Sequence, residues 1–167
     1  MLEIALDSDE EWDSSRSWAV LFRQAAEAAI AESAYPEIAE FERPVEISVT
    51  LTGDDQVRAL NAKWRGKDKA TNVLSFPMAD ERDLGYANVA GAELLLGDII
   101  LARGVCEAEA ADKGLSVEQH ATHLVVHGTL HLLGYDHEED RGAADMEARE
   151  VRALARLGIA SPYEVPA

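Results

Sequence analysis

Apolar and polar positions alternate or recur in patterns that divide the chain into strands and helices. Residues Val45 to Leu51 alternate strictly, which is typical of a strand with one buried face. Shorter strand-like runs occupy residues 2–6 and 72–76, and the run 94–101 is apolar on both faces, as in a central strand. Strands interleaved with helices predict an α/β (α+β) fold with a small mixed sheet of about four strands and helices packed on it.

Helical spacing of apolar residues predicts helices over residues 17–32 and 143–157, another ending near Lys113, and one marked by Val57, Leu60 and Trp64. The longest helix is expected to begin at Ser116, where Gln119 completes a capping box, and to end at Gly134. It is apolar nearly all round, so we expect it to be buried. Residues 79–92 are expected to form a loop, and Gly97-Asp98 indicates either a bulge in the central strand or a close approach of another group to it.

Composition is that of an ordinary globular protein, with 47% apolar and 28% charged residues. We expect one domain over residues 1–167. No apolar run approaches the roughly 18 residues of a membrane span, and the acidic N-terminus lacks the features of a signal peptide, so we expect a cytoplasmic protein without membrane contact. Cys106 is the single cysteine; it can form no internal disulfide and is expected to be a small buried side chain.

The net charge of −17 should repel nucleic acid on average. Residues 58–69, RALNAKWRGKDK, are the exception. Five basic residues and one acid give this basic block a charge of +4, so the rest of the chain carries −21. The basic block either binds an anionic partner or forms an ordinary solvated loop.

Three histidines lie in the stretch HGTLHLLGYDH. His127 and His131 are four residues apart on the buried helix, so their imidazoles share one face and can reach one ion at about 2.1 Å. A reversal after Gly134 would bring His137 to the same point. Three imidazoles and one open position predict a catalytic zinc site with one zinc per chain. The single cysteine excludes a Cys-rich structural zinc site.

The other two histidines fit this site less well. His123 also precedes His127 by four residues, but one ion cannot be reached from both ends of the row. We therefore expect His123 to be a neighbour that lines the cleft, and His120 to lie at the surface or behind the ligands. Asp136 either orients a ligand histidine through its second ring N–H or has a purely structural role in the turn.

The histidine spacing also matches the metzincin protease pattern H-E-x-x-H-x-x-G-x-x-H. In that pattern the glutamate after the first histidine is the general base. Here the position is Gly128, so a zinc metallohydrolase or protease of this type would lack its proton acceptor.

With these motifs the chain resembles the YbeY family of bacterial endoribonucleases. The resemblance rests on HGTLHLLGYDH with the acidic run and Met146-Glu147 after it, on LNAKWRGKDKATNVLSFP, and on LGDI. In order and spacing it spans roughly residues 45–157. It implies a small α/β fold, a zinc ion on His127, His131 and His137, and a role for Arg65 in RNA cleavage. It further implies action in ribosomal RNA maturation, at the 3′ end of the small-subunit rRNA, and in ribosome quality control. A small-subunit ribosomal protein and a ribosome-assembly GTPase are the implied partners.

The chemistry of these residues agrees with an RNA substrate. Zinc can polarise a phosphoryl oxygen, and the guanidinium of Arg65 matches phosphate oxygens bidentately. We expect Arg65 and the metal ligand His127 to be catalytic, and Lys63, Lys67 and Lys69 to hold flanking phosphates or to be ordinary solvated lysines. Trp64 is expected to anchor the end of its helix in the core. DNA is not expected as a partner. Two alternatives stay open: a metallohydrolase, disfavoured by Gly128, and a non-catalytic ribosome-assembly factor with a structural zinc.

Overall fold

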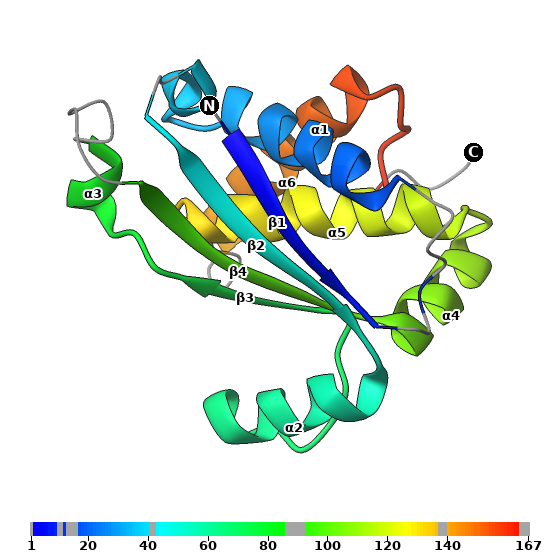
Figure 1. Cartoon of the computed structure of the whole chain (residues 1–167). Helices are drawn as coiled ribbons and strands as arrows, with labels where there is room; N and C mark the ends of the chain where they lie inside the picture. The colour runs from blue at the N-terminus through cyan, green and yellow to red at the C-terminus, as the bar shows by residue number, and fades with distance from the viewer. Residues whose placement is uncertain are drawn as a thin grey trace.

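A four-stranded sheet with the strand order β1-β2-β4-β3 runs through the molecule (Figure 1). The computed structural model describes residues 2–9, 12, 17–40, 43–85, 93–136 and 140–163. The strands are β1 (Leu2–Ser8), β2 (Val45–Thr52), β3 (Val73–Pro77) and β4 (Leu94–Ala102). β1, β2 and β4 are parallel, whereas the edge strand β3 pairs antiparallel with β4. The predicted small mixed sheet is confirmed, and so is the interior position of the strand at residues 94–102.

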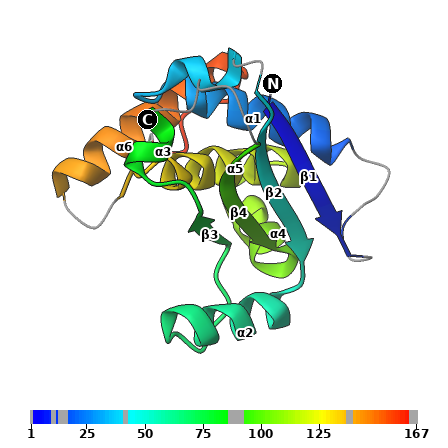
Figure 2. The same cartoon turned by 60° about the vertical axis from the view of Figure 1, so that its left-hand side comes forward.

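Helices cover both faces of this sheet. They are α1 (Trp18–Ala31), the 3-10 helix η1 (Pro36–Glu40), α2 (Asp54–Arg65), α3 (Glu81–Gly85), α4 (Arg103–Lys113), α5 (Val117–Leu132) and α6 (Asp140–Arg156). α1, α5 and α6 lie together on one face, and α2 lies on the other (Figures 1 and 2). The expected loop at residues 79–92 contains the short helix α3, and residues 86–92 lie outside the described part of the chain. No described helix is long and apolar enough to cross a membrane.

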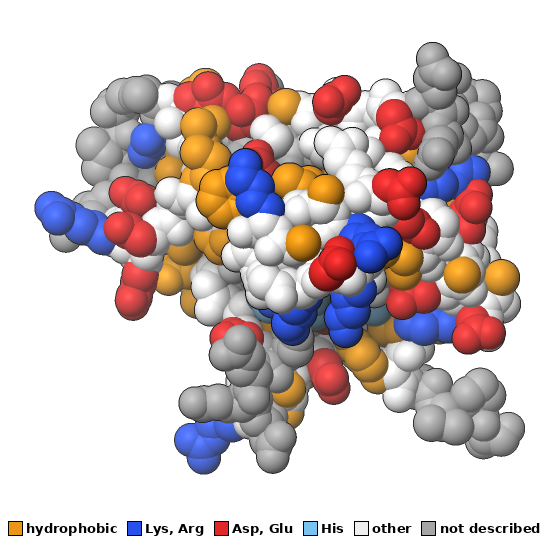
Figure 3. Space-filling model, turned by 90° about the horizontal axis from the view of Figure 1, so that it is seen from below, with side chains coloured by type: hydrophobic (Ala, Val, Ile, Leu, Met, Phe, Trp, Pro, Cys, Tyr) orange, Lys and Arg blue, Asp and Glu red, His pale blue; other side chains and the backbone are white. Residues whose placement is uncertain are grey.

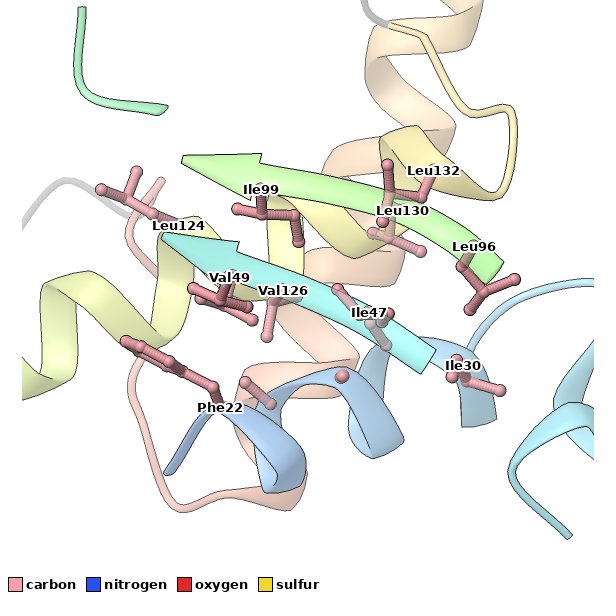
Figure 4. Packing of buried hydrophobic residues seen from close by; sticks show 14 of the residues in the cluster. Phe22, Ile30, Ile47, Val49, Leu96, Ile99, Leu124, Val126, Leu130 and Leu132 are labelled. Carbon is pink, nitrogen blue, oxygen red and sulfur yellow. The ribbon is translucent and has the colours of Figure 1, made fainter. Parts of the chain in front are cut away.

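The core fills the space between the sheet and the helices α1 and α5. Side chains of β2 and β4 point toward those of the two helices, as Figure 4 shows for Val49, Ile99 and Leu124. Cys106 is fully buried beside this core, as predicted. The register between β2 and β4 shifts where Glu46 and Ile47 face Leu95 and Gly97, which confirms the predicted bulge.

The two ends of α5 follow the predicted signals. Ser116 Oγ accepts a hydrogen bond from the N–H of Gln119, and the Gln119 side chain accepts one from the N–H of Ser116, both at 3.1 Å. Gly134 follows the C-cap with φ of 97°, where a side chain would be strained. The N–H of Tyr135 then bonds to the carbonyl of Leu130 at 3.0 Å. The helix therefore ends directly after the second histidine of the predicted metal site, and the chain turns away.

α2 is attached to the sheet by a second, smaller apolar cluster. Val57 packs there with Leu74 and Ala102, and Leu60 borders the cluster. Farther along the same face of the helix, Trp64 keeps 63% of its surface exposed. The expectation that Trp64 anchors the helix end in the core is wrong, because the helix extends beyond the part of the sheet that could cover it (Figures 1 and 2).

Candidate functional site

A cavity of about 670 Å³ lies beside the edge strand β3, where α5 ends. The basic block contributes Arg65 and Lys67 to its wall. β3 and the segment before it contribute Ser75 and Asn72. The end of α5 and the following turn contribute His127, His131 and Asp136. Two histidines and two cations from distant parts of the sequence therefore share one concave surface.

His127 and His131 present the same ring atom to each other. Their Nε2 atoms lie 3.1 Å apart. Two imidazoles that bind one ion at about 2.1 Å with tetrahedral angles place their nitrogens about 3.4 Å apart, so the pair fits a shared metal ion with little adjustment. The third predicted ligand, His137, lies outside the described residues. Within those residues, no group of three or more His, Cys, Asp or Glu side chains is arranged to hold a metal ion.

Glu150 of α6 is hydrogen-bonded to His127 through Nδ1, the ring nitrogen that does not face His131. Its carboxylate is fully buried and accepts a hydrogen bond from Nδ1 of His127. Burial alone would raise the pKa of Glu150, but hydrogen bonds from His123 and His127 lower it to about 2. The carboxylate is therefore ionised and can only accept. This fixes the proton of His127 on Nδ1 and leaves the Nε2 lone pair directed at the cavity.

The same carboxylate binds two further side chains. His123 Nε2 lies 3.1 Å from Glu150 Oε2, and the hydroxyl of Tyr163 donates to the same oxygen. Burial and the carboxylate raise the pKa of Tyr163, which keeps its hydroxyl protonated. His123 is 7% exposed and does not line the cavity. The expectation that His123 lines the cleft is wrong. The ring of His123 is buried, and its Nε2 is bonded to Glu150 of α6.

His120 is also inside the protein rather than at the surface. It is 1% exposed, and its Nε2 lies 2.8 Å from Oε1 of Glu109 on α4. Glu109 also accepts from the side-chain amide of Asn72 at 2.9 Å. Burial lowers the pKa of His120 and favours its neutral form. His120 thus orients, through Glu109, the asparagine in the cavity wall.

The basic block is divided by the fold. Arg65 and Lys67 line the cavity, whereas Lys63 and Lys69 do not. Arg58 forms a two-point ion pair with Asp68, at 2.8 and 3.2 Å. Figure 3 views the molecule from the side of α2 and shows Lys and Arg side chains gathered around a small patch of histidine surface. Cations of the basic block are therefore presented at the mouth of the histidine site.

Gly128 faces the sheet and not the cavity. A Cβ atom at this position would lie 3.0 Å from Oγ of Ser75 and 3.1 Å from Cδ1 of Ile99. The glycine lets α5 pack closely on β3 and β4. A glutamate here would press against Ser75 and Ile99 from its Cβ onward, so it would not fit without moving one of them.

The turn after α5 is held by Tyr135. The Tyr135 hydroxyl accepts a hydrogen bond from the N–H of Ala34 at 2.9 Å, and the guanidinium carbon of Arg149 lies 4.7 Å from the centre of its ring. The next residue, Asp136, lines the cavity. The segment after α1 and the helix α6 thus fix the direction in which the chain leaves the site.

Glu150 is the main residue of the site that sequence reasoning missed. Met146, Ala153 and Leu154 mark the inner face of the last helix, and Glu150 falls on that same face by helical spacing. A single acid on an apolar face is a signal for a buried partner. Its pairing with His123 and His127, 27 and 23 residues earlier on a different helix, does not follow from spacing alone.

Comparison with known proteins gives a consistent result. A family model described as Endoribonuclease YbeY matches residues 7–158. Proteins described as Endoribonuclease YbeY from Rhizorhabdus wittichii and Novosphingobium aromaticivorans are 50% and 51% identical to the chain. The two alignments cover 99% and 97% of this chain and 98% and 96% of the relatives. The solution structure of a Thermotoga maritima protein is similar in fold, with a TM-score of 0.53, 24% identity, and coverage of 99% of this chain and 100% of that one.

Proposed function

Because the chain belongs to the YbeY endoribonuclease family, we propose that it cleaves single-stranded RNA with the help of a bound metal ion during ribosomal RNA maturation. The observation that carries the proposal is the joint presence of the His127–His131 pair and of Arg65 and Lys67 on one cavity. The 3′ end of the small-subunit rRNA is the proposed substrate, in the cytoplasm. A small-subunit ribosomal protein and a ribosome-assembly GTPase are the proposed partners.

We propose that His127, His131 and His137 hold one zinc ion per chain. An all-imidazole donor set suits zinc, and the Nε2 separation of 3.1 Å between the first two supports a shared ion. A bound zinc ion would supply Lewis acidity toward a phosphoryl oxygen or a water molecule. Glu150 keeps the proton of His127 on Nδ1, so that Nε2 is available as a ligand. Asp136, in the cavity wall, would orient another ligand histidine in the same way.

The cations of the cavity act on the phosphate. Arg65 presents two parallel N–H donors, which match two oxygens of the scissile phosphodiester and stabilise the charge that develops there. Lys67 neutralises a flanking phosphate as a point charge. Lys63 and Lys69 lie farther out on the basic block and would contact phosphates beyond the cavity. The scissile phosphate therefore lies between Arg65 and the two histidines.

A protease reaction is the weaker interpretation. It needs a carboxylate at position 128, and the packing of Gly128 against Ser75 and Ile99 leaves no room for one. Among the described residues that line the cavity there is no glutamate, and the acid among them is Asp136.

The test is a cleavage assay on single-stranded RNA with zinc-reconstituted protein. We expect cleavage by the wild type, loss in His131→Ala, and normal activity in Arg58→Ala, whose guanidinium is paired with Asp68 outside the cavity. Mapping of the product ends identifies the nucleophile, since attack by the RNA 2′-OH leaves a cyclic phosphate. Zinc-loaded, folded protein without any RNA cleavage would favour a non-catalytic assembly factor, and peptide cleavage instead would favour a metalloprotease.

A further inference from the structure

Trp64 is the most exposed large apolar side chain of the described residues, with 63% of its surface open. It stands in the last turn of α2, directly before the cavity residue Arg65. The other two tryptophans, Trp12 and Trp18, are 2% and 4% exposed. An exposed indole gains free energy when a ligand covers it, and this one stands beside the proposed site.

The surroundings of Trp64 define the charge of that ligand. The ammonium group of Lys63 lies 5.1 Å from the centre of the indole ring, and Arg65 and Lys67 follow along the chain. This is a local positive charge on a protein whose net charge is −17. An apolar protein partner would gain nothing from these cations, whereas a polyanion with aromatic groups matches both features. Single-stranded RNA is such a molecule.

We propose that Trp64 is a stacking platform for one unpaired base of the RNA, next to the phosphate held at Arg65. The proposal rests on the proposed function and names a substrate contact within it. The Cα atoms of adjacent residues are about 3.8 Å apart, so a base on Trp64 and a phosphate at Arg65 belong to the same or a neighbouring nucleotide. Duplex RNA cannot offer a free base face, and Trp64 therefore adds a preference for single strands.

The direct test measures the affinity for a cleavage-resistant single-stranded RNA of about ten nucleotides, with zinc-loaded protein and fluorescence anisotropy of the labelled RNA. Trp64→Ala should weaken binding about tenfold or more, and Trp64→Phe should retain most of the affinity. Val20→Ala, at another exposed apolar position on α1, is the matched control and should bind like the wild type. Equal melting temperatures verify that each variant folds.

Three further measurements separate stacking from charge. The slope of log K against log[salt] should be unchanged in Trp64→Ala but shallower by about 0.7 in Lys67→Ala, because only the latter loses a phosphate contact. On an abasic RNA of the same length, the wild type and Trp64→Ala should bind equally. RNA should also quench the fluorescence of the exposed tryptophan, and this quenching should vanish in Trp64→Phe.

Wild-type affinity of Trp64→Ala for the normal RNA would overturn the proposal and leave the indole to a protein partner. A defect of equal size on abasic RNA would also overturn it. The outcome is independent of the cleavage assay: Trp64-dependent binding without cleavage refutes only the proposed function, and cleavage with Trp64-independent binding refutes only the stacking platform.

Discussion

The buried carboxylate of Glu150 accepts a hydrogen bond from Nδ1 of His127, and so joins α6 to the histidine face of α5. The ring of His127 is held with Nε2 toward the cavity, 3.1 Å from Nε2 of His131. A buried carboxylate behind a ligand histidine raises the basicity of that ligand and fixes its orientation. The proposed metal site therefore depends on two helices: α5 carries the histidines and α6 carries the carboxylate that orients one of them.

Replacing Glu150 should weaken the metal site without removing a ligand. We expect Glu150→Gln to lower the zinc affinity by about 10- to 100-fold, because the amide no longer fixes the tautomer of His127. Competition with a chromophoric chelator measures this affinity. Glu109→Gln is the matched control: Glu109 also accepts from a histidine, His120, but neither residue lines the cavity and His120 is not one of the proposed zinc ligands. Equal zinc affinity of wild type and Glu150→Gln would show that Glu150 only stabilises the fold.

Removal of Arg65 should affect the chemical step. We expect Arg65→Ala to keep its fold and zinc but to lose about 10²–10³ in the rate of RNA cleavage, as is typical for a donor that stabilises developing charge. Arg65→Lys should restore only part of the rate, since an ammonium group makes no bidentate contact. Lys67→Ala should mainly weaken binding. Single-turnover rates at saturating enzyme separate these effects, and a wild-type rate of Arg65→Ala there would reduce Arg65 to a docking residue.

Local sequence signals predicted much of the fold and, within the candidate site, the pairing of His127 with His131. The alternation at residues 45–51, the capping box at Ser116 and the glycine stop at Gly134 all act within one or two turns of chain. The spacing of His127 and His131 belongs to this class, because a helix alone brings them together. These features depend on backbone geometry, which the neighbouring residues determine.

Features that depend on how elements pack were not predictable in the same way. Glu150 meets His123 and His127 only because α6 packs on α5. Trp64 continues the apolar spacing of Val57 and Leu60, but the pattern cannot show where the sheet beneath the helix ends. The division of the basic block into cavity and outer cations likewise follows from the turn after α2.

The packing of Gly128 leaves no space for a side chain as long as glutamate. We expect Gly128→Glu to destabilise the protein by at least about 3 kcal/mol and to create no peptidase activity, because its carboxylate would be buried against Ser75 and Ile99. Gly128→Ala should fold with little change in stability, since its contacts need to shift only slightly and alanine favours the helix. Denaturant unfolding measures both variants. A stable Gly128→Glu protein that cleaves peptides would revive the protease interpretation.

Burial, with a smaller contribution from Glu109, raises the pKa of Cys106 to about 12. The native protein should therefore react with iodoacetamide at least about a hundredfold more slowly than the urea-unfolded chain. In the unfolded chain the thiol ionises near pH 9, so between about pH 9 and pH 12 the unfolded state loses the proton first and stability falls as pH rises. Cys106→Ala should lack this component of the alkaline decline. Rapid alkylation of the native protein would contradict the buried thiol.

The most direct test of the account is the titration of metal-free protein with zinc while the cleavage rate of single-stranded RNA is recorded. The account predicts a rate that rises linearly and reaches its plateau at one zinc per chain. His131→Ala should bind no zinc tightly and stay inactive. His123 lies outside the cavity, so His123→Ala should keep nearly all of its zinc. Full cleavage by the metal-free protein, or tight zinc binding and cleavage by His131→Ala, would contradict the metal-dependent site.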